Sequence, residues 1–75
     1  MELTLKEIGP VIRRHRKAAG LTQHELADLA GVGKSVVFDI EKGKETVKVV
    51  TLAKVLHTLN IGVVLKSPLA GGERQ

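Results

Sequence analysis

Apolar and polar positions along the chain repeat with the spacing of short amphipathic helices. Thr4 and Glu7 have the spacing of a capping box, and the apolar positions that follow predict a first helix that stops at Gly20. Gly9 and Pro10 disturb its first turns, so the helix begins either at Thr4 with one missing hydrogen bond or close to Pro10. Its repeating positions are Ile8, Ile12, His15, Arg16 and Ala19.

Two shorter helices are predicted next. Thr22 and Glu25 form a second capping-box pattern, which opens a helix that ends at the turn formed by residues 31–33. A third helix covers residues 34–42 and closes on a glycine. The residues of these two helices that are expected to face the core are Leu26, Leu29, Ala30, Val37 and Ile40.

A fourth helix and one strand complete the pattern. Thr46 is a suitable N-cap for the helix, whose apolar stripe would consist of Val49, Leu52, Ala53, Leu56 and Leu59. Residues 61–68 are β-branched and apolar, and Pro68 stops them, so they predict a single strand. An unpaired strand leaves its backbone groups open, and pairing with the same strand of a second copy would satisfy them. The alternative is an apolar tail packed on the helices.

The expected architecture is an all-α domain of four to five helices in residues 1–60, a dimerisation strand in residues 61–68 and a flexible tail in residues 69–75. The core of a chain of 75 residues is marginal by itself, so association with a second copy would add stability. The strand residues that would pair across the dimer are Ile61, Val63, Val64 and Leu65.

The composition argues against several classes of protein. The chain has no cysteine, its three histidines are scattered, and no apolar run approaches the roughly 18 residues of a membrane span. We therefore expect no disulfide, metal site, cofactor or membrane insertion, and a cytoplasmic, nucleoid-associated protein. The sequence also lacks a nucleophile–base pair and a glycine-rich phosphate loop, so it does not predict an enzyme.

The charge of the chain points to nucleic acid. Lys and Arg number 12 against 8 Asp and Glu, which gives a net charge of +4, and residues 13–17 form a basic cluster. Two short capped helices joined by a tight glycine-containing turn are typical of a helix-turn-helix, whose second helix enters the major groove of DNA.

The same stretch resembles a known family. Residues 16–44 read "RKAAGLTQHELADLAGVGKSVVFDIEKGK". The elements "GLTQ-x-ELA", "GV" at the turn and "IE-x-GK" resemble the XRE-type helix-turn-helix domain of bacterial and phage regulators, and the resemblance covers residues 8–59. It implies a lambda-repressor-like fold. The fourth helix and "LNIGVVLKSP" resemble the HipB-like antitoxins, in which a C-terminal strand pairs across the dimer.

Helical spacing turns one face of the third helix away from the core, and the resemblance also places this face in the groove. Lys34 can reach a phosphate or a guanine edge, and Ser35 can donate to either. An apolar side chain can contact a thymine methyl group, and Asp39 would either repel phosphates or accept from a cytosine amine. The predicted base-reading residues are Lys34, Ser35, Val36, Phe38 and Asp39.

Other residues are predicted to hold the DNA backbone or the fold. Thr22 and the amide groups at the start of the second helix can bind a phosphate, and Gln23 resembles the family glutamine that anchors the backbone. The basic candidates for phosphate contact are Arg13, Lys42 and Lys44. The resemblance implies an ion pair between Arg16 and Glu41. Gly33 stands where the family usually has a capping serine or threonine, so a hydroxyl that could bind a phosphate is missing.

The sequence thus predicts a homodimeric repressor that binds double-stranded DNA at an inverted repeat. The HipB-like resemblance implies the antitoxin of a HipBA-like toxin–antitoxin operon, which represses its own promoter and binds a HipA-like kinase toxin. The alternatives are a stand-alone phage-type repressor, a restriction-modification controller, or a protein-interaction module that has kept the fold and lost DNA binding.

Overall fold

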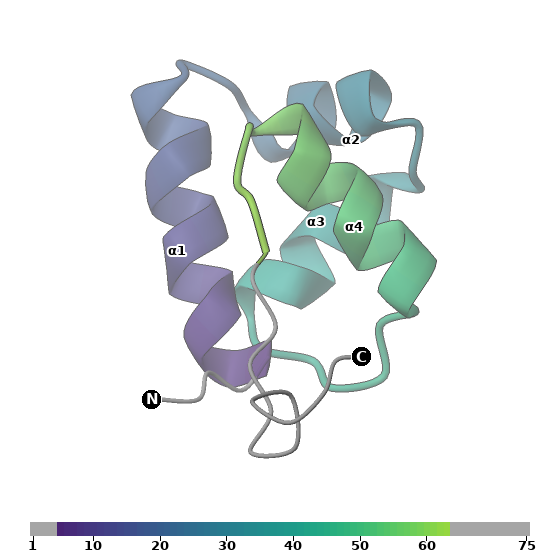
Figure 1. Cartoon of the computed structure of the whole chain (residues 1–75). Coiled ribbons are helices and arrows are strands. Elements are labelled where there is room, and N and C mark those ends of the chain that lie inside the picture. The colour runs from purple at the N-terminus through teal and green to yellow at the C-terminus, as the bar shows by residue number, and fades with distance from the viewer. Residues whose placement is uncertain (1–4, 64–75) are drawn as a thin grey trace, which may run out of the picture.

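The computed structural model describes residues 5–63 and contains four helices in that range. They are α1 (Leu5–Ala18), α2 (Gln23–Ala30), α3 (Lys34–Glu41) and α4 (Val49–Thr58). In Figure 1, α1 stands along one side, α2 and α4 lie on the other, and α3 crosses between them. α3 packs against α1 and α2, and α2 packs against α4. The predicted all-α fold is confirmed for these residues.

One apolar core joins the four helices. α3 contributes Val37 and Ile40, as its spacing predicts. The other buried hydrophobic residues are Ile12, Leu26, Ala27, Val55 and Leu56. Because both core residues of α3 lie on one side of the helix, the opposite side remains at the surface.

The backbones of α1 and α3 come close together at Gly9. A Cβ atom on this residue would lie 2.5 Å from the carbonyl oxygen of Ile40 and 2.8 Å from that of Glu41, so only glycine fits there. α1 continues through Pro10, and the described part of the helix already begins at Leu5. The glycine therefore serves a close helix contact and does not interrupt α1. The proposed Thr4 cap lies outside the described residues.

Two expectations for the fourth helix are wrong. α4 begins after Lys48, which has no capping side chain, so Thr46 is not its N-cap. Val49 is 81% exposed and Ala53 is also exposed, whereas Val55 is completely buried. Apolar residues occur around most of this helix, so spacing alone could not select the side that α2 covers.

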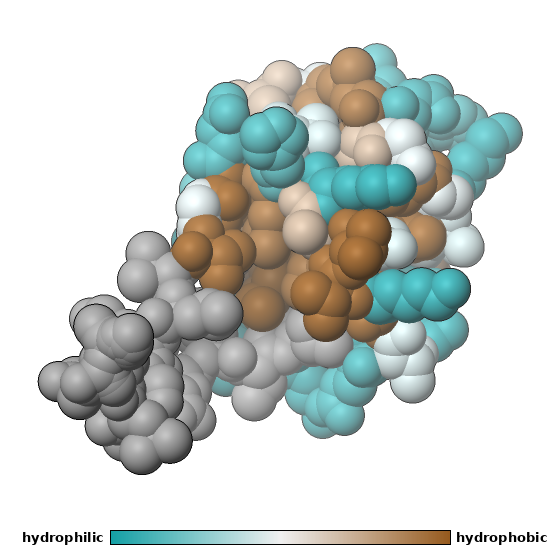
Figure 2. All heavy atoms as spheres, turned by 45° about the vertical axis from the view of Figure 1, so that its right-hand side comes forward, coloured by the Kyte–Doolittle hydropathy of each residue, from teal (hydrophilic) through white to brown (hydrophobic). Residues whose placement is uncertain are grey.

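α2 is also turned differently from the prediction. Leu29 is 65% exposed, and Ala27 is completely buried in its place. α2 packs against α3 on one side and α4 on another, and the small side chain of Ala27 fits between them. Figure 2 shows that apolar side chains also gather at the surface. The exposed large apolar residues of the described range are Leu29, Phe38, Val49, Val50 and Val63.

Residues 61–63 have no regular secondary structure. The amide of Ile61 donates to the carbonyl of Leu56 (2.9 Å), so the chain turns back at the end of α4. In the view of Figure 1 this segment runs past the gap between α1 and α4. The rest of the predicted strand, with Val64 and Leu65, and the predicted tail lie outside the described residues. No helix in residues 5–63 is long and apolar enough to cross a membrane.

Candidate nucleic-acid interface

A capping box starts α2 at the surface. The Thr22 hydroxyl accepts a hydrogen bond from the Glu25 amide (3.0 Å), and Glu25 Oε1 accepts one from the Thr22 amide (2.8 Å). The bond from the Thr22 backbone amide holds the pKa of Glu25 below its usual value. The predicted cap is confirmed, and it makes Gln23 the first residue of the helix.

A tight turn sets the angle between α2 and α3. Gly31 has the left-handed φ of 71°, which favours glycine, and its amide donates to the carbonyl of Asp28 (3.2 Å). Gly33 is the N-cap of α3 and, having no side chain, makes no side-chain capping bond. α3 therefore begins with Lys34 and Ser35, both of them exposed.

A buried ion pair fixes the other end of α3. Arg16 Nε donates to Glu41 Oε2 (2.6 Å) and Arg16 Nη2 donates to Glu41 Oε1 (3.1 Å), so the predicted pair is present and bidentate. The two side chains are only 9% and 4% exposed. Arg16 Nη1 also donates to the carbonyl of Leu21 (2.8 Å). The hydrogen bond that Arg16 donates to Glu41 keeps the pKa of Arg16 above its ordinary value, so Arg16 stays charged.

Gln23 joins this network from the start of α2. Its Nε2 donates to Glu41 Oε1 (3.0 Å), a contact that the sequence did not indicate, because the two residues are 18 positions apart. Burial raises the pKa of Glu41, but the hydrogen bonds from Arg16 and Gln23 outweigh it and hold this pKa below its usual value. The charge of Arg13 acts in the same direction. Glu41 thus connects α1, α2 and α3 at one point.

The exposed face of α3 is the candidate interface. Lys34, Ser35 and Phe38 are exposed along it, and Lys42, which is also exposed, follows at the end of the helix. The Lys42 Nζ lies over the Phe38 ring, 4.9 Å from its centre. The predicted groove-facing residues are thus split, because Val36 and Asp39 are half-buried.

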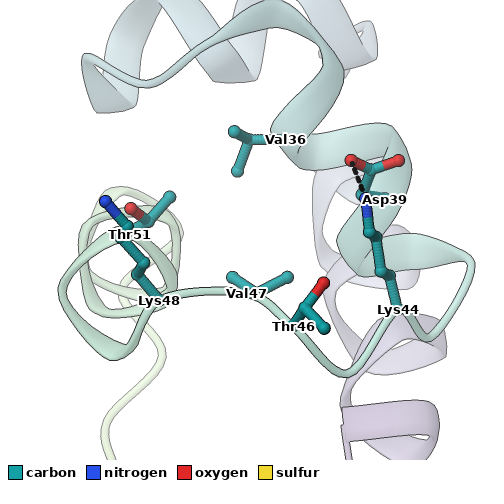
Figure 3. Close-up of a pocket in the computed structure, with 7 residues that line it drawn as sticks. All are labelled: Val36, Asp39, Lys44, Thr46, Val47, Lys48 and Thr51. Atoms are coloured by element: carbon teal, nitrogen blue, oxygen red, sulfur yellow. Dashed lines mark ion pairs between the residues drawn. The ribbon is translucent and has the colours of Figure 1, made fainter.

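Val36 and Asp39 instead border a groove between α3 and the start of α4 (Figure 3). The Asp39 carboxylate lies 3.7 Å from the ammonium of Lys44 and faces the groove (Figure 3). The groove has a volume of about 300 Å³. Its lining residues are Val36, Asp39, Lys44, Thr46, Val47, Lys48 and Thr51. Basic, hydroxyl and apolar groups therefore line this groove, which lies beside the exposed face of α3.

Among the predicted phosphate contacts, Thr22, Arg13, Lys42 and Lys44 are exposed, whereas Gln23 is half-buried. Arg13 and Gln23 both act on Glu41, so they lie on the same side of the domain. Cationic side chains thus occur on α1 near Glu41, at the start of α3 and just after its end. Such a distribution suits a polyanion that runs along α3.

Sequence relatives carry the same kind of domain. The helix-turn-helix family model matches residues 12–65. An uncharacterized HTH-type transcriptional regulator of Sinorhizobium fredii is 39% identical over 72 residues, which cover 96% of this chain and 91% of the relative. A second such regulator, from Methanothermobacter thermautotrophicus, is 37% identical over 49 residues, 65% of this chain and 71% of the relative.

Solved structures extend the comparison. HipB, in its complex with the O4 20mer, superposes with a TM-score of 0.78 over 91% of this chain and 96% of HipB, at 20% identity. The restriction-modification controller protein C.AhdI of Aeromonas hydrophila is 36% identical with a TM-score of 0.69, over 77% of this chain and 88% of C.AhdI. By its sequence relatives and by the helix pair described above, the chain belongs to the helix-turn-helix family of DNA-binding transcriptional regulators.

Proposed function

We propose that the protein is a homodimeric repressor that places α3 of each copy in successive major grooves of an inverted repeat, about 34 Å apart. The observation that carries this proposal is the exposed face of α3, which is attached through Glu41 to a buried network on α1 and α2. A recognition helix that is already fixed loses little conformational freedom on binding. Its contacts with bases can then contribute fully to sequence discrimination.

Exposure separates the base-reading residues into two groups. Lys34, Ser35 and Phe38 would make the central base contacts, because their side chains lie open on α3. Val36 and Asp39 would reach only bases at the edge of the contact, next to the groove of Figure 3. The phosphate contacts would come from Thr22, Gln23, Arg13, Lys42 and Lys44.

Exposed valines support association of two copies. Val49 and Val50 at the start of α4 are 81% and 68% exposed, and Val63 is 63% exposed. Apolar surface of this kind is unfavourable in water and often marks a protein contact. Ile61 and Val63 would belong to the same interface as Val64 and Leu65, through the strand predicted in residues 61–68.

The solved relatives favour two kinds of repressor. HipB covers almost the whole chain, and it has also been solved in a HipA–HipB–O2–O3 complex. On this ground the protein would be the antitoxin of a HipBA-like operon and would bind a HipA-like kinase toxin. The identity of 36% to C.AhdI favours a restriction-modification controller as the second candidate. Co-purification of a HipA-like kinase with the tagged chain supports the first candidate, and a methyltransferase and endonuclease in the same operon support the second.

DNA binding is tested by selection from a pool of random duplexes, followed by titration at about 50 to 200 mM salt. We expect an inverted-repeat sequence and an affinity that falls steeply with salt, as counterion release requires. Lys34→Ala with Ser35→Ala should weaken binding at least about tenfold, from the loss of base contacts in each half-site. Lys54→Ala, which removes an exposed cation from α4, is the matched control. Equal affinity of both variants, or a flat salt dependence, would contradict the proposal.

A further inference from the structure

Phe38 and Lys42 form a pair on the exposed face of α3. The Lys42 ammonium lies 4.9 Å from the centre of the ring, and the two residues are one helical turn apart. The ring is 46% exposed, and Phe38 is the one large apolar residue of α3 that remains exposed. It is also the only aromatic residue of the chain.

The fold does not require an aromatic ring at this position. Val37 and Ile40 fill the core side of α3, and both are almost completely buried. An exposed ring amid polar neighbours is instead suited to a partner that presents an apolar group within a polar, anionic surface. In the major groove, the apolar group that a base pair presents is the C5-methyl group of thymine.

Lys42 determines how the ring can meet such a group. The attraction between the cation and one face of the ring favours the ring orientation seen here, which leaves the other face and the edge for a partner. The same cation would be attracted to the phosphates that flank the groove. Asp39 does not oppose this contact, because its carboxylate lies beside Lys44 and faces the groove between α3 and α4 (Figure 3).

We propose that Phe38 and Lys42 act together to read the C5-methyl group of a thymine in each half-site. Phe38 makes the contact, and Lys42 is a positioning residue that holds the ring. This inference rests on the DNA-binding function proposed above and names the chemical group that the recognition helix selects. It also assigns to Lys42 a role in sequence discrimination, in addition to phosphate attraction.

Replacing thymine by uracil tests the contact, since uracil keeps every hydrogen-bonding group and lacks only the methyl group. Each thymine of the duplex selected from the random pool is replaced in both half-sites, one position at a time. At the position that Phe38 reads, binding should weaken about fourfold per half-site, or roughly fifteenfold in all. Phe38→Ala should bind the thymine and uracil duplexes equally.

The role of Lys42 is tested by the ratio of the two affinities. Lys42→Met should reduce the preference for thymine over uracil, and Lys42→Arg, which keeps a cation over the ring, should retain it. A residue that only contacts phosphate would behave differently: Lys42→Met would then weaken both duplexes equally and leave the ratio unchanged. Circular dichroism of each variant confirms that the helices are intact.

The outcomes separate this inference from the function on which it rests. If no duplex sequence is enriched from the pool, the proposed sequence-specific DNA binding is wrong, and the inference fails with it. If a sequence is enriched but no thymine position responds to uracil, DNA binding stands and the methyl-reading role of Phe38 is overturned. If Phe38→Ala keeps the full preference for thymine, another residue reads the methyl group.

Discussion

The two flanks of α3 are built in contrasting ways. On the side of α1 and α2, a buried bidentate ion pair and a glycine-mediated backbone contact hold the helix. On the side of α4, an open groove of about 300 Å³ lies between α3 and the start of α4. At its border the half-buried Asp39 carboxylate pairs with the exposed ammonium of Lys44 at 3.7 Å. α4 itself starts without a capping side chain and with two exposed valines.

The two sides of α3 therefore have different roles: one holds the helix in place, and the other is open to a partner. The buried side determines where the recognition helix stands, because a charged pair with its hydrogen bonds satisfied has few alternative arrangements. The open side keeps cations, hydroxyl groups and apolar groups in water, where a partner can reach them. We therefore expect substitutions on the first side to change stability, and substitutions on the second side to change binding.

The largest effect is expected for Glu41→Ala. The substitution leaves Arg16 buried without its carboxylate, so the free energy of unfolding should fall by about 3–5 kcal/mol in urea denaturation. Glu45→Ala removes an exposed acid from the loop before α4 and should change it by less than about 0.5 kcal/mol. Similar losses in the two variants would remove the contrast between the two sides.

The same ion pair predicts a pH dependence. The pKa of Glu41 is lower in the folded protein than in the unfolded chain, so its stabilising contribution is present above the unfolded pKa of about 4.3. This contribution is lost as the pH falls through the lower, folded pKa. In denaturation experiments at decreasing pH, the wild type should lose stability below about pH 4.3 more steeply than the double variant Arg16→Met with Glu41→Leu. Parallel curves would show that the pair does not contribute.

The second largest effect is expected for Gly9→Ala. A methyl group would collide with the carbonyl oxygens of Ile40 and Glu41 and push α1 away from α3, so unfolding should become easier by about 2–3 kcal/mol. Gly62→Ala is the matched control, because a Cβ atom there meets nothing within 4 Å. Thermal denaturation of the two variants is sufficient, and equal melting temperatures would argue against the close contact.

A smaller effect is expected at the helix caps. Thr22→Ala should cost about 1 kcal/mol in the free energy of unfolding, because the Glu25 amide loses its acceptor. Thr46→Ala should have almost no effect, since α4 begins after Lys48. Equal losses for the two threonines would mean that Thr46 caps a helix in solution after all.

The smallest effect on stability is expected for Lys44→Gln. Its ammonium is exposed to solvent and only 3.7 Å from the half-buried Asp39, so the free energy of unfolding should change by less than about 0.5 kcal/mol. If Lys44 contacts a phosphate, the slope of log affinity against log salt should fall by about one per subunit. A large loss of stability would mean that Lys44 helps to hold α3 in place, as the Arg16–Glu41 pair does.

Local patterns in the sequence are sufficient to predict some of the helix caps and the buried side of α3. The capping box at Thr22, the glycine cap before α3 and the inward side of α3 follow from spacing and residue chemistry within a few positions. These features depend on hydrogen bonds between near neighbours and on the 3.6-residue repeat, so they survive in almost any tertiary context. The Arg16–Glu41 pair was accessible through family resemblance, since no local rule connects residues 25 positions apart.

The tertiary structure decided the remainder. Gly9 looked like an interruption of α1 and proved to be the point where α1 meets α3. Gln23 donates a hydrogen bond to Glu41. In α4, Val55 is buried and Val49 is exposed. Each of these outcomes depends on which helix packs against which face. The sequence by itself determined the helices and the exposed side of α3, whereas only packing decided what holds α3 in place, because long-range contacts select among faces that local periodicity leaves equivalent.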